Sequence, residues 1–157
     1  MLRLELARVE DFEAVNRLSR QVCELHAQWD GTIQVVDHPY PMDYFQECIG
    51  ENSLFESAIY AARQNGTVVG FMRFYLWETN SPVSEKRKML SIDDIGVEEA
   101  LRNQGIGTEM MQQLRVLAKG WGCDSVHLYV DAQNESAYAY YLKCGFRVRN
   151  MGMGMKL

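Results

Sequence analysis

The fold of this 157-residue chain is decided by the stretch Asp93-Asp94-Ile95-Gly96-Val97-Glu98-Glu99-Ala100-Leu101-Arg102-Asn103-Gln104-Gly105-Ile106-Gly107-Thr108. An apolar, strand-like run carries two carboxylates and a glycine, and an Arg-x-x-Gly-x-Gly loop after it opens an amphipathic helix. Backbone N–H groups in the first turn of a helix have no intrahelical partner, and the helix dipole favours negative charge beside them. The stretch therefore predicts a strand, a loop and a helix that together bind a phosphate-bearing ligand.

The rest of the chain alternates between strand-like and helix-like patterns. Strands are expected at residues 2–7, 57–63, 67–77, 89–97 and 125–130, with a terminal strand or hairpin over 146–157. Helices are expected at about 12–29, 42–49, 106–121 and 134–144, and Asn65-Gly66 between two apolar runs is a strong hairpin signal. This order predicts a single α/β (α+β) domain over residues 1–157. Its mixed sheet should hold about six to seven strands, with an antiparallel first half, one right-handed parallel crossover and helices on both faces.

Net charge and cysteine usage argue against several classes of function. The formal net charge of −5 disfavours a nucleic-acid surface. The first residues lack the apolar core of a signal peptide, and no apolar run approaches membrane length. The four cysteines form no Cys-x-x-Cys pair and no Cys/His cluster at metal-ligand spacing. We therefore expect a cytoplasmic protein with reduced thiols, no bound metal, and no nucleic-acid or membrane partner.

Two familiar phosphate-binding loops do not fit the glycine-rich segment. A P-loop requires a lysine directly after its last glycine, and no lysine follows Gly107. The dinucleotide-binding fingerprint requires a third small residue where Met110 stands, and it opens a chain of alternating strands and helices. Both interpretations are rejected.

The segment instead resembles motif A of the GNAT superfamily of acetyltransferases, [Gln/Arg]-x-x-Gly-x-[Gly/Ala]. Val97 precedes Arg102 by five residues, as at the end of the fourth strand in that family. Downstream, the family's pattern Asn-x-x-Ala-x-x-x-Tyr-x-Lys-x-Gly-Phe is matched from Asn134 to Phe146, with Tyr141 at the tyrosine position. The resemblance implies the GNAT fold and an N-acetyltransferase that uses acetyl-coenzyme A as co-substrate.

The resemblance also implies which residues contact coenzyme A. The pyrophosphate would lie on the loop and the first turn of the helix, and the pantetheine arm would pair with the backbone of the fourth strand. Asn134 and Tyr141 would face the thioether. The implied cofactor-binding residues are Ile95, Val97, Arg102, Asn103, Gln104, Gly105, Ile106, Gly107, Thr108, Asn134 and Tyr141.

Three residues are candidates for the chemistry. An amine with a pKa of about 10.4 must lose a proton before it attacks, and a carboxylate can collect that proton. Asp93 is the first choice and Asp94 the second, because strand alternation sends neighbours to opposite faces although a bulge could exchange them. The alternative is that both aspartates are solvated or cap a turn. Tyr141 matches the family's tyrosine acid, which would protonate the departing thiolate.

The acceptor and the assembly are less specified. No cysteine lies in a recognisable nucleophile setting, so we expect direct attack by a primary amine, from a small molecule or a peptide, in a ternary complex. The alternative is a coenzyme A-binding regulatory module without turnover. The irregular segment 32–41 is either a wall of the acceptor pocket or a plain crossover between helices. The resemblance further implies a homodimer formed through the terminal strands.

Overall fold

The computed structural model describes residues 1–155 and 157. The five strands are β1 (Leu2–Leu6), β2 (Ala58–Gln64), β3 (Thr67–Glu78), β4 (Lys88–Val97) and β5 (Ser125–Leu128). The α-helices are α1 (Phe12–His26), α2 (Met42–Cys48), α3 (Ser53–Glu56), α4 (Ile106–Gly120) and α5 (Glu135–Lys143). Two short 3-10 helices, η1 (Val9–Asp11) and η2 (Glu99–Leu101), precede α1 and the glycine-rich loop.

The strands form one mixed sheet in the order β1-β2-β3-β4-β5. Neighbours are antiparallel from β1 to β4, and β5 returns parallel to β4 after the α4 crossover. The β2–β3 hairpin turns through Asn65 and Gly66, both with positive φ, 51° and 82°, as a two-residue type I′ turn requires. The predicted mixed sheet with an antiparallel first half and one parallel crossover is confirmed.

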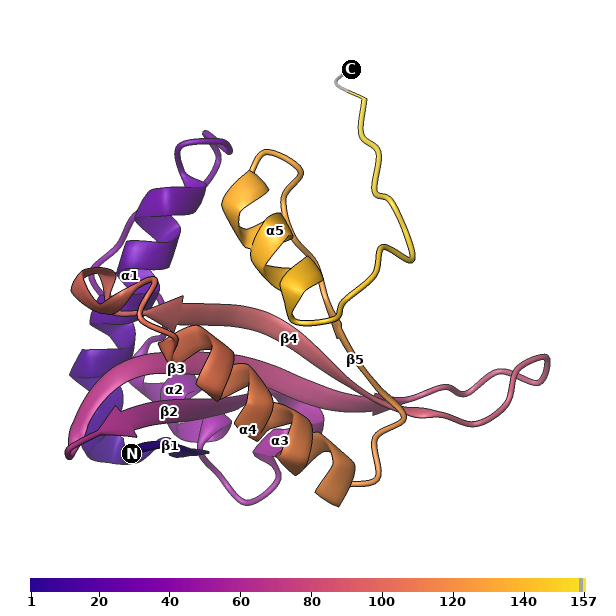
Figure 1. The fold of residues 1–157 in the computed structure, drawn as a ribbon, viewed down its shortest axis with the longest axis horizontal. Coiled ribbons are helices and arrows are strands. Elements are labelled where there is room, and N and C mark those ends of the chain that lie inside the picture. Colours follow the sequence, from indigo (N-terminus) through magenta and orange to yellow (C-terminus); the bar gives the residue numbers. More distant parts are fainter. Residues whose placement is uncertain (156) are drawn as a thin grey trace.

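Helices cover both faces of this sheet (Figure 1). On one face α4 buries Met110 and Leu114 against Met72, Phe74 and Leu90 of the sheet. The other face is covered by α1 and α2, whose buried side chains meet those of β2 and β3; this cluster includes Val15, Leu18, Phe45, Ile59 and Phe71. In α1, Val15, Leu18 and Val22 recur at intervals of three and four residues and form its sheet-facing side.

The predicted count of six to seven strands is wrong for the described residues. Residues 146–155 form neither a strand nor a hairpin. Met151, Met153 and Met155 alternate with glycine and are 84%, 95% and 84% exposed. A strand needs a partner and a surface to pack on, and glycine weakens it further, so alternation alone did not produce one. Lys156, the last polar position of the predicted strand, lies outside the described residues.

Among the described residues, the structure contains no helix that combines the length and the apolar character needed to span a membrane.

Candidate active site

A bulge in β4 places both candidate carboxylates on the same side of the sheet. Arg73 of β3 pairs with Asp94 while its neighbour Phe74 pairs with Ile92, so Asp93 is the extra residue. Ile92 and Ile95 consequently both pack on the α4 side of the sheet. Strand alternation predicted that Asp93 and Asp94 would point to opposite faces, but the bulge turns both toward the α1 and α2 side.

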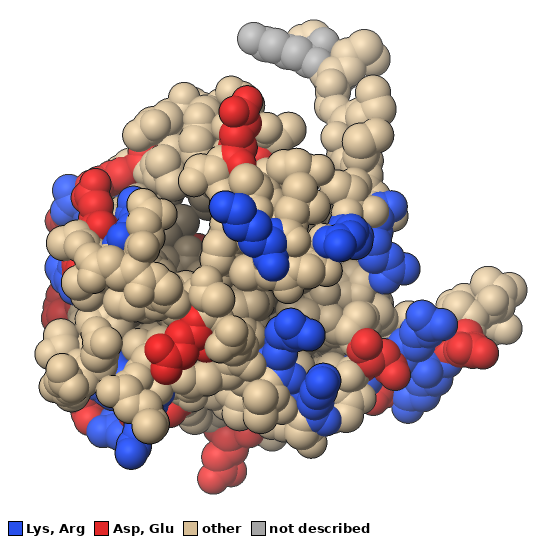
Figure 2. All heavy atoms as spheres, viewed as in Figure 1, with Lys and Arg blue, Asp and Glu red and all other residues tan. Residues whose placement is uncertain are grey.

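Beyond the bulge, the outer edge of β4 is free. Pairing between β4 and β5 ends at Ile92 and Leu128, whereas β4 continues to Val97. The two strands diverge there, and α5 lies above the gap (Figure 1). Figure 2 shows the surface hollowed between α1 and α5, above this end of β4.

The backbone of Ile95 and Val97 faces this gap. Glu98 N–H donates to the Val69 carbonyl at 2.9 Å, and antiparallel pairing alternates, so Val97 and Ile95 turn their own N–H and C=O groups away from β3. Gly96 between them lies under α1, where a Cβ atom would be 2.6 Å from Phe71 Cε1. The glycine inside the predicted strand is therefore required by close packing.

The glycine-rich loop forms a concave backbone surface at the start of α4. Asn103 and Gly105 have left-handed backbone, with φ of 61° and 86°, and no side chain caps the helix at Gly105. Alternating backbone handedness of this kind orients successive N–H groups toward one point. Ile106 contributes only backbone, since its side chain is buried in the core, whereas Gln104 and Thr108 are exposed.

Arg102 lies beside the loop with its side chain directed back to the sheet. Its Nε donates to the Val97 carbonyl at 3.1 Å and one terminal nitrogen lies 3.4 Å from the Gln21 Oε1 atom. The guanidinium thus ties the end of β4 to α1. This is a structural contact of the kind expected of a residue that fixes the position of the loop.

The two aspartates have different partners. Asp93 forms an ion pair with Arg73 of β3, with 3.2 Å between Nη1 and Oδ2. Asp94 is half-buried and accepts a hydrogen bond from the Tyr40 hydroxyl. Burial raises the pKa of Asp94, while the Tyr40 hydroxyl and the Arg73 guanidinium oppose that rise. Asp93 is therefore a paired carboxylate, and Asp94 is a carboxylate in a setting suited to accept a proton.

Residues of α5 close the site from the opposite side. Asn134 is buried, and its Oδ1 accepts from Ala137 N–H at 3.1 Å, so it caps α5. Tyr141 is half-buried and packs edge-on against Phe146, with 5.7 Å between ring centroids. Burial, helped by the charge of Asp94, raises the pKa of Tyr141 to about 12. The fold thus brings Tyr141 within electrostatic reach of Asp94.

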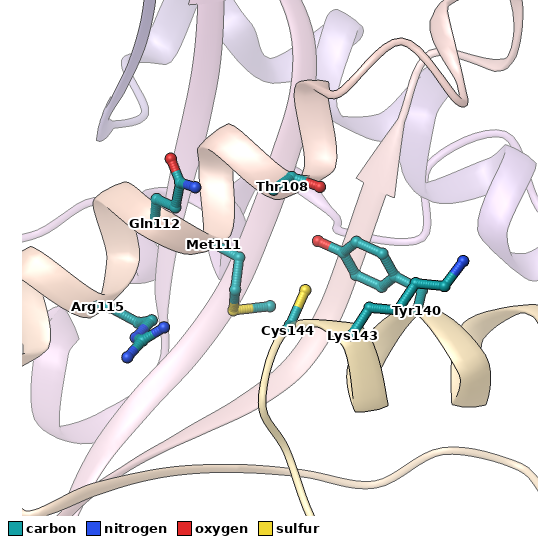
Figure 3. A pocket seen from close by; sticks show the side chains of 7 residues that line it. All are labelled: Thr108, Met111, Gln112, Arg115, Tyr140, Lys143 and Cys144. Carbon is teal, nitrogen blue, oxygen red and sulfur yellow. The ribbon is translucent and has the colours of Figure 1, made fainter.

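A groove between α4 and α5 extends from the glycine-rich loop. It encloses about 200 Å³ and is lined by Thr108, Met111, Gln112, Arg115, Tyr140, Lys143 and Cys144. Figure 3 shows the Tyr140 hydroxyl pointing toward the start of α4, on the side of Thr108. That hydroxyl also fills the space beside Gly107, where a Cβ atom would lie 3.3 Å from it. A side chain at position 107 would therefore press on the Tyr140 hydroxyl between the two helices.

Sequence reasoning missed two residues of this site, Tyr40 and Arg73. Arg73 was detectable as the one charged residue inside the apolar run of β3. Tyr40 lies in the segment 32–41, for which a pocket wall and a plain crossover were equally open. Its contact with Asp94 now favours the pocket wall. Among the described residues, no group of three His, Cys, Asp or Glu is placed to hold a metal ion.

Comparison with known proteins places this geometry in a family. The model of the acetyltransferase (GNAT) family matches residues 20–146. The chain belongs to this family. The RimI N-alpha-acetyltransferase of Mycobacterium tuberculosis is 30% identical over 135 residues, which are 85% of this chain and 76% of that protein. An uncharacterized N-acetyltransferase of Methanocaldococcus jannaschii is 31% identical over 100 residues. This chain spans 43% of the length of that relative.

Solved structures share this fold over nearly the whole chain. A mutant of the BH1408 protein of Bacillus halodurans has a TM-score of 0.89 at 26% identity, covering 99% of both chains. An aminoglycoside acetyltransferase from a soil metagenomic sample has a TM-score of 0.72 at 18% identity, covering 99% of this chain and 96% of that one. The second likeness concerns the fold alone.

The packing around Gly96 yields a testable prediction. In Gly96→Ala the new methyl group meets Phe71 and Val22, so α1 or β4 must shift, at a cost of about 1–3 kcal/mol in the free energy of unfolding. The shift also displaces the backbone of Ile95 and Val97. Urea unfolding measures the first effect, and the dissociation constant of coenzyme A measures the second.

Gly120→Ala is the matched control, because nothing lies within 4 Å of a Cβ atom at that position of α4. It should be neutral or stabilising by up to about 1 kcal/mol. Equal effects of the two substitutions would show that Gly96 is not held by close packing.

Proposed function

We propose that this protein transfers an acetyl group from acetyl-coenzyme A to a primary amine, by direct attack in a ternary complex. The observation that carries the proposal is the edge of β4 beyond Ile92, which does not pair with β5. The two aspartates lie on this part of β4, the glycine-rich loop follows it, and Tyr141 lies within electrostatic reach of Asp94. Bound acetyl-coenzyme A supplies an activated thioester. The residues of this chain bind it, orient the acceptor and move one proton.

The described residues fit the co-substrate. Left-handed Asn103 and Gly105 let the amides of the loop and of the uncapped start of α4 converge on a pyrophosphate. The pantetheine arm has amides that can pair with the gap-facing N–H and C=O of Ile95 and with the N–H of Val97, as an added strand does. Arg102 already occupies the Val97 carbonyl, so we assign it to fixing the loop rather than to the phosphates.

The proton of the acceptor goes to Asp94 in this scheme. A primary ammonium with a pKa of about 10.4 is neutral in roughly one molecule of a few thousand at pH 7, so attack needs a base. The sequence favoured Asp93, but the ion pair with Arg73 neutralises that carboxylate and holds it in place. Asp94 has a raised pKa and lies near Tyr141, on the edge of the gap.

Tyr141 donates a hydrogen bond to the departing sulfur. Its raised pKa keeps the phenol protonated through the physiological range. A thiol with a pKa of about 8.5 is a stronger acid than this phenol, so complete proton transfer from Tyr141 to the thiolate is uphill. A hydrogen bond from Tyr141 stabilises the thiolate without such a transfer, and the thiolate takes its proton from the nitrogen of the tetrahedral intermediate, which loses its second proton as the amide forms. The acceptor is a primary amine of a small molecule or a peptide, as the names of the aminoglycoside and N-alpha relatives suggest.

The first test removes the phenol. Tyr141→Phe should lower kcat at least tenfold and leave the KM for acetyl-coenzyme A nearly unchanged, because the hydroxyl acts mainly on the leaving sulfur. Release of coenzyme A thiol over a panel of amines measures the rate. Tyr138→Phe, on the exposed side of the same helix, is the control. Unchanged turnover in Tyr141→Phe would remove Tyr141 from the mechanism, and coenzyme A binding without thiol release on any amine would support a regulatory module.

The second test separates the aspartates. Asp94→Asn should lower kcat/KM about a hundredfold or more and abolish the acidic limb of its pH profile, because the base is active only when deprotonated. Since the pKa of Asp94 is raised, that limb in the wild type should lie above the ordinary range of an aspartate. Asp93→Asn should keep the limb and lose less activity. The reverse ranking would assign the base to Asp93.

A cytoplasmic location stays a prediction from the sequence.

The C-terminal segment, residues 146–155, leads us to propose a homodimer. Met151, Met153 and Met155 are exposed and would be buried between two copies. Sedimentation should give twice the monomer mass, and replacing the three methionines with serine should give the monomer. A monomeric wild type would refute the dimer.

A further inference from the structure

The reaction scheme gives no role to Tyr40, although its hydroxyl contacts Asp94. We propose that Tyr40 is a positioning residue, whose hydroxyl holds Asp94 in the orientation and charge state in which it accepts the proton of the amine. The inference rests on the proposed function, in which Asp94 is the base. Tyr40 lies outside the glycine-rich motif and the Asn134–Phe146 motif, and its role is argued from the contacts of this chain.

The backbone of Tyr40 is fixed by α1. Asn16, itself buried, accepts from Tyr40 N–H at 2.8 Å through Oδ1 and donates to the Tyr40 carbonyl at 3.1 Å through Nδ2. Pro39 and Pro41 flank the residue and restrict φ on both sides. The irregular loop is therefore held in place at Tyr40, whose side chain reaches β4.

The ring of Tyr40 is held equally firmly. It is 6% exposed and packs edge-on against Phe71, with 6.1 Å between centroids. The Arg73 guanidinium lies 5.7 Å from the Tyr40 ring centroid, and the same guanidinium pairs with Asp93. A fixed backbone and a fixed ring place the hydroxyl against Asp94, to which it donates.

The contact divides the two oxygens of Asp94 between two tasks. Tyr40 donates to Oδ2, and among the described side chains no other hydrogen bond reaches this carboxylate. We assign Oδ1 to the acceptor amine; the backbone N–H of Ile95 also favours the charged form of this carboxylate. Burial, reinforced by Asp94, raises the pKa of Tyr40 well above its ordinary value, so Tyr40 stays the donor and Asp94 the acceptor.

Several charged or titratable groups surround Asp94, and Tyr40 is the one that bonds it directly. Burial raises the pKa of Asp94, and the bond from Tyr40 is the largest opposing influence. A hydrogen bond to the charged form favours that form, so loss of the hydroxyl must raise the pKa further. The other facing groups are Arg73 of β3, Asp93 of β4, Cys23 and His26 of α1, and Tyr141 of α5.

The test is Tyr40→Phe, which removes the hydroxyl and keeps the ring between Phe71 and Arg73. The acidic limb of the kcat/KM profile should move to higher pH. Below the midpoint kcat/KM should fall about tenfold, as expected for loss of one hydrogen bond to a charged group, and on the plateau it should change little. Tyr44→Phe is the control, because that hydroxyl lies 3.1 Å from Arg73 and does not contact Asp94. The acidic limb of the Tyr44→Phe profile should stay at the pH of the wild type.

A second measurement does not depend on turnover. The carboxyl of Asp94, followed by carbon NMR in the free protein, should titrate at higher pH in Tyr40→Phe than in the wild type. An unmoved titration, or a loss of kcat/KM that is uniform in pH, would overturn the role of Tyr40.

The double variant distinguishes failure of this inference from failure of the proposed function. In Asp94→Asn, adding Tyr40→Phe should change kcat/KM little, because the hydroxyl acts through Asp94. Full activity of Asp94→Asn would refute the base itself. Loss of activity in Asp94→Asn, together with an additive, pH-independent loss in the double variant, would refute only the role of Tyr40.

Discussion

One extra residue in β4, Asp93, sets the geometry on which the rest of the site depends. Because Asp93 bulges out of register with β3, two consecutive carboxylates turn to the same face while Ile92 and Ile95 keep the opposite face apolar. The same bulge coincides with the end of pairing to β5. The two carboxylates therefore stand at the point where β4 and β5 part.

The two sides of the gap are fixed by different elements. The glycine-rich loop is tied to β4 through Arg102 and to the core through Ile106, so its amides cannot move independently of the strand edge. On the other side, Tyr141 is placed by α5, whose start is capped by the buried Asn134. Each group with a proposed role is thus carried by an element that the core or a cap immobilises, which is what a preorganised site requires.

Local signals in the sequence predicted the local features of this fold. Asn65-Gly66 turns as expected, and the glycine-rich loop opens a helix, α4, which begins at Ile106. The common face of Asp93 and Asp94 was not predictable, because a bulge depends on the register with a strand some twenty residues earlier. Tyr40 was missed for the same reason, since 54 positions separate it from Asp94. The terminal strand failed because alternation specifies a strand only where a neighbouring edge pairs with it.

The charges around the gap favour a cationic acceptor and an uncharged product. Arg73 and Asp93 neutralise each other, which leaves Asp94 as the carboxylate that an ammonium group can approach. In the proposed reaction one proton of the ammonium passes to Asp94, the second leaves the nitrogen with the coenzyme A thiolate, and the amine becomes a neutral amide, so the attraction that bound the acceptor disappears with its charge. Burial makes Asp94 a better base, whereas Tyr40 and Arg73 favour its ionised form and hence the loss of that proton to solvent. Turnover needs both the uptake of the proton by Asp94 and its release to solvent. Burial alone would hinder the release, and the contacts of Tyr40 and Arg73 alone would hinder the uptake.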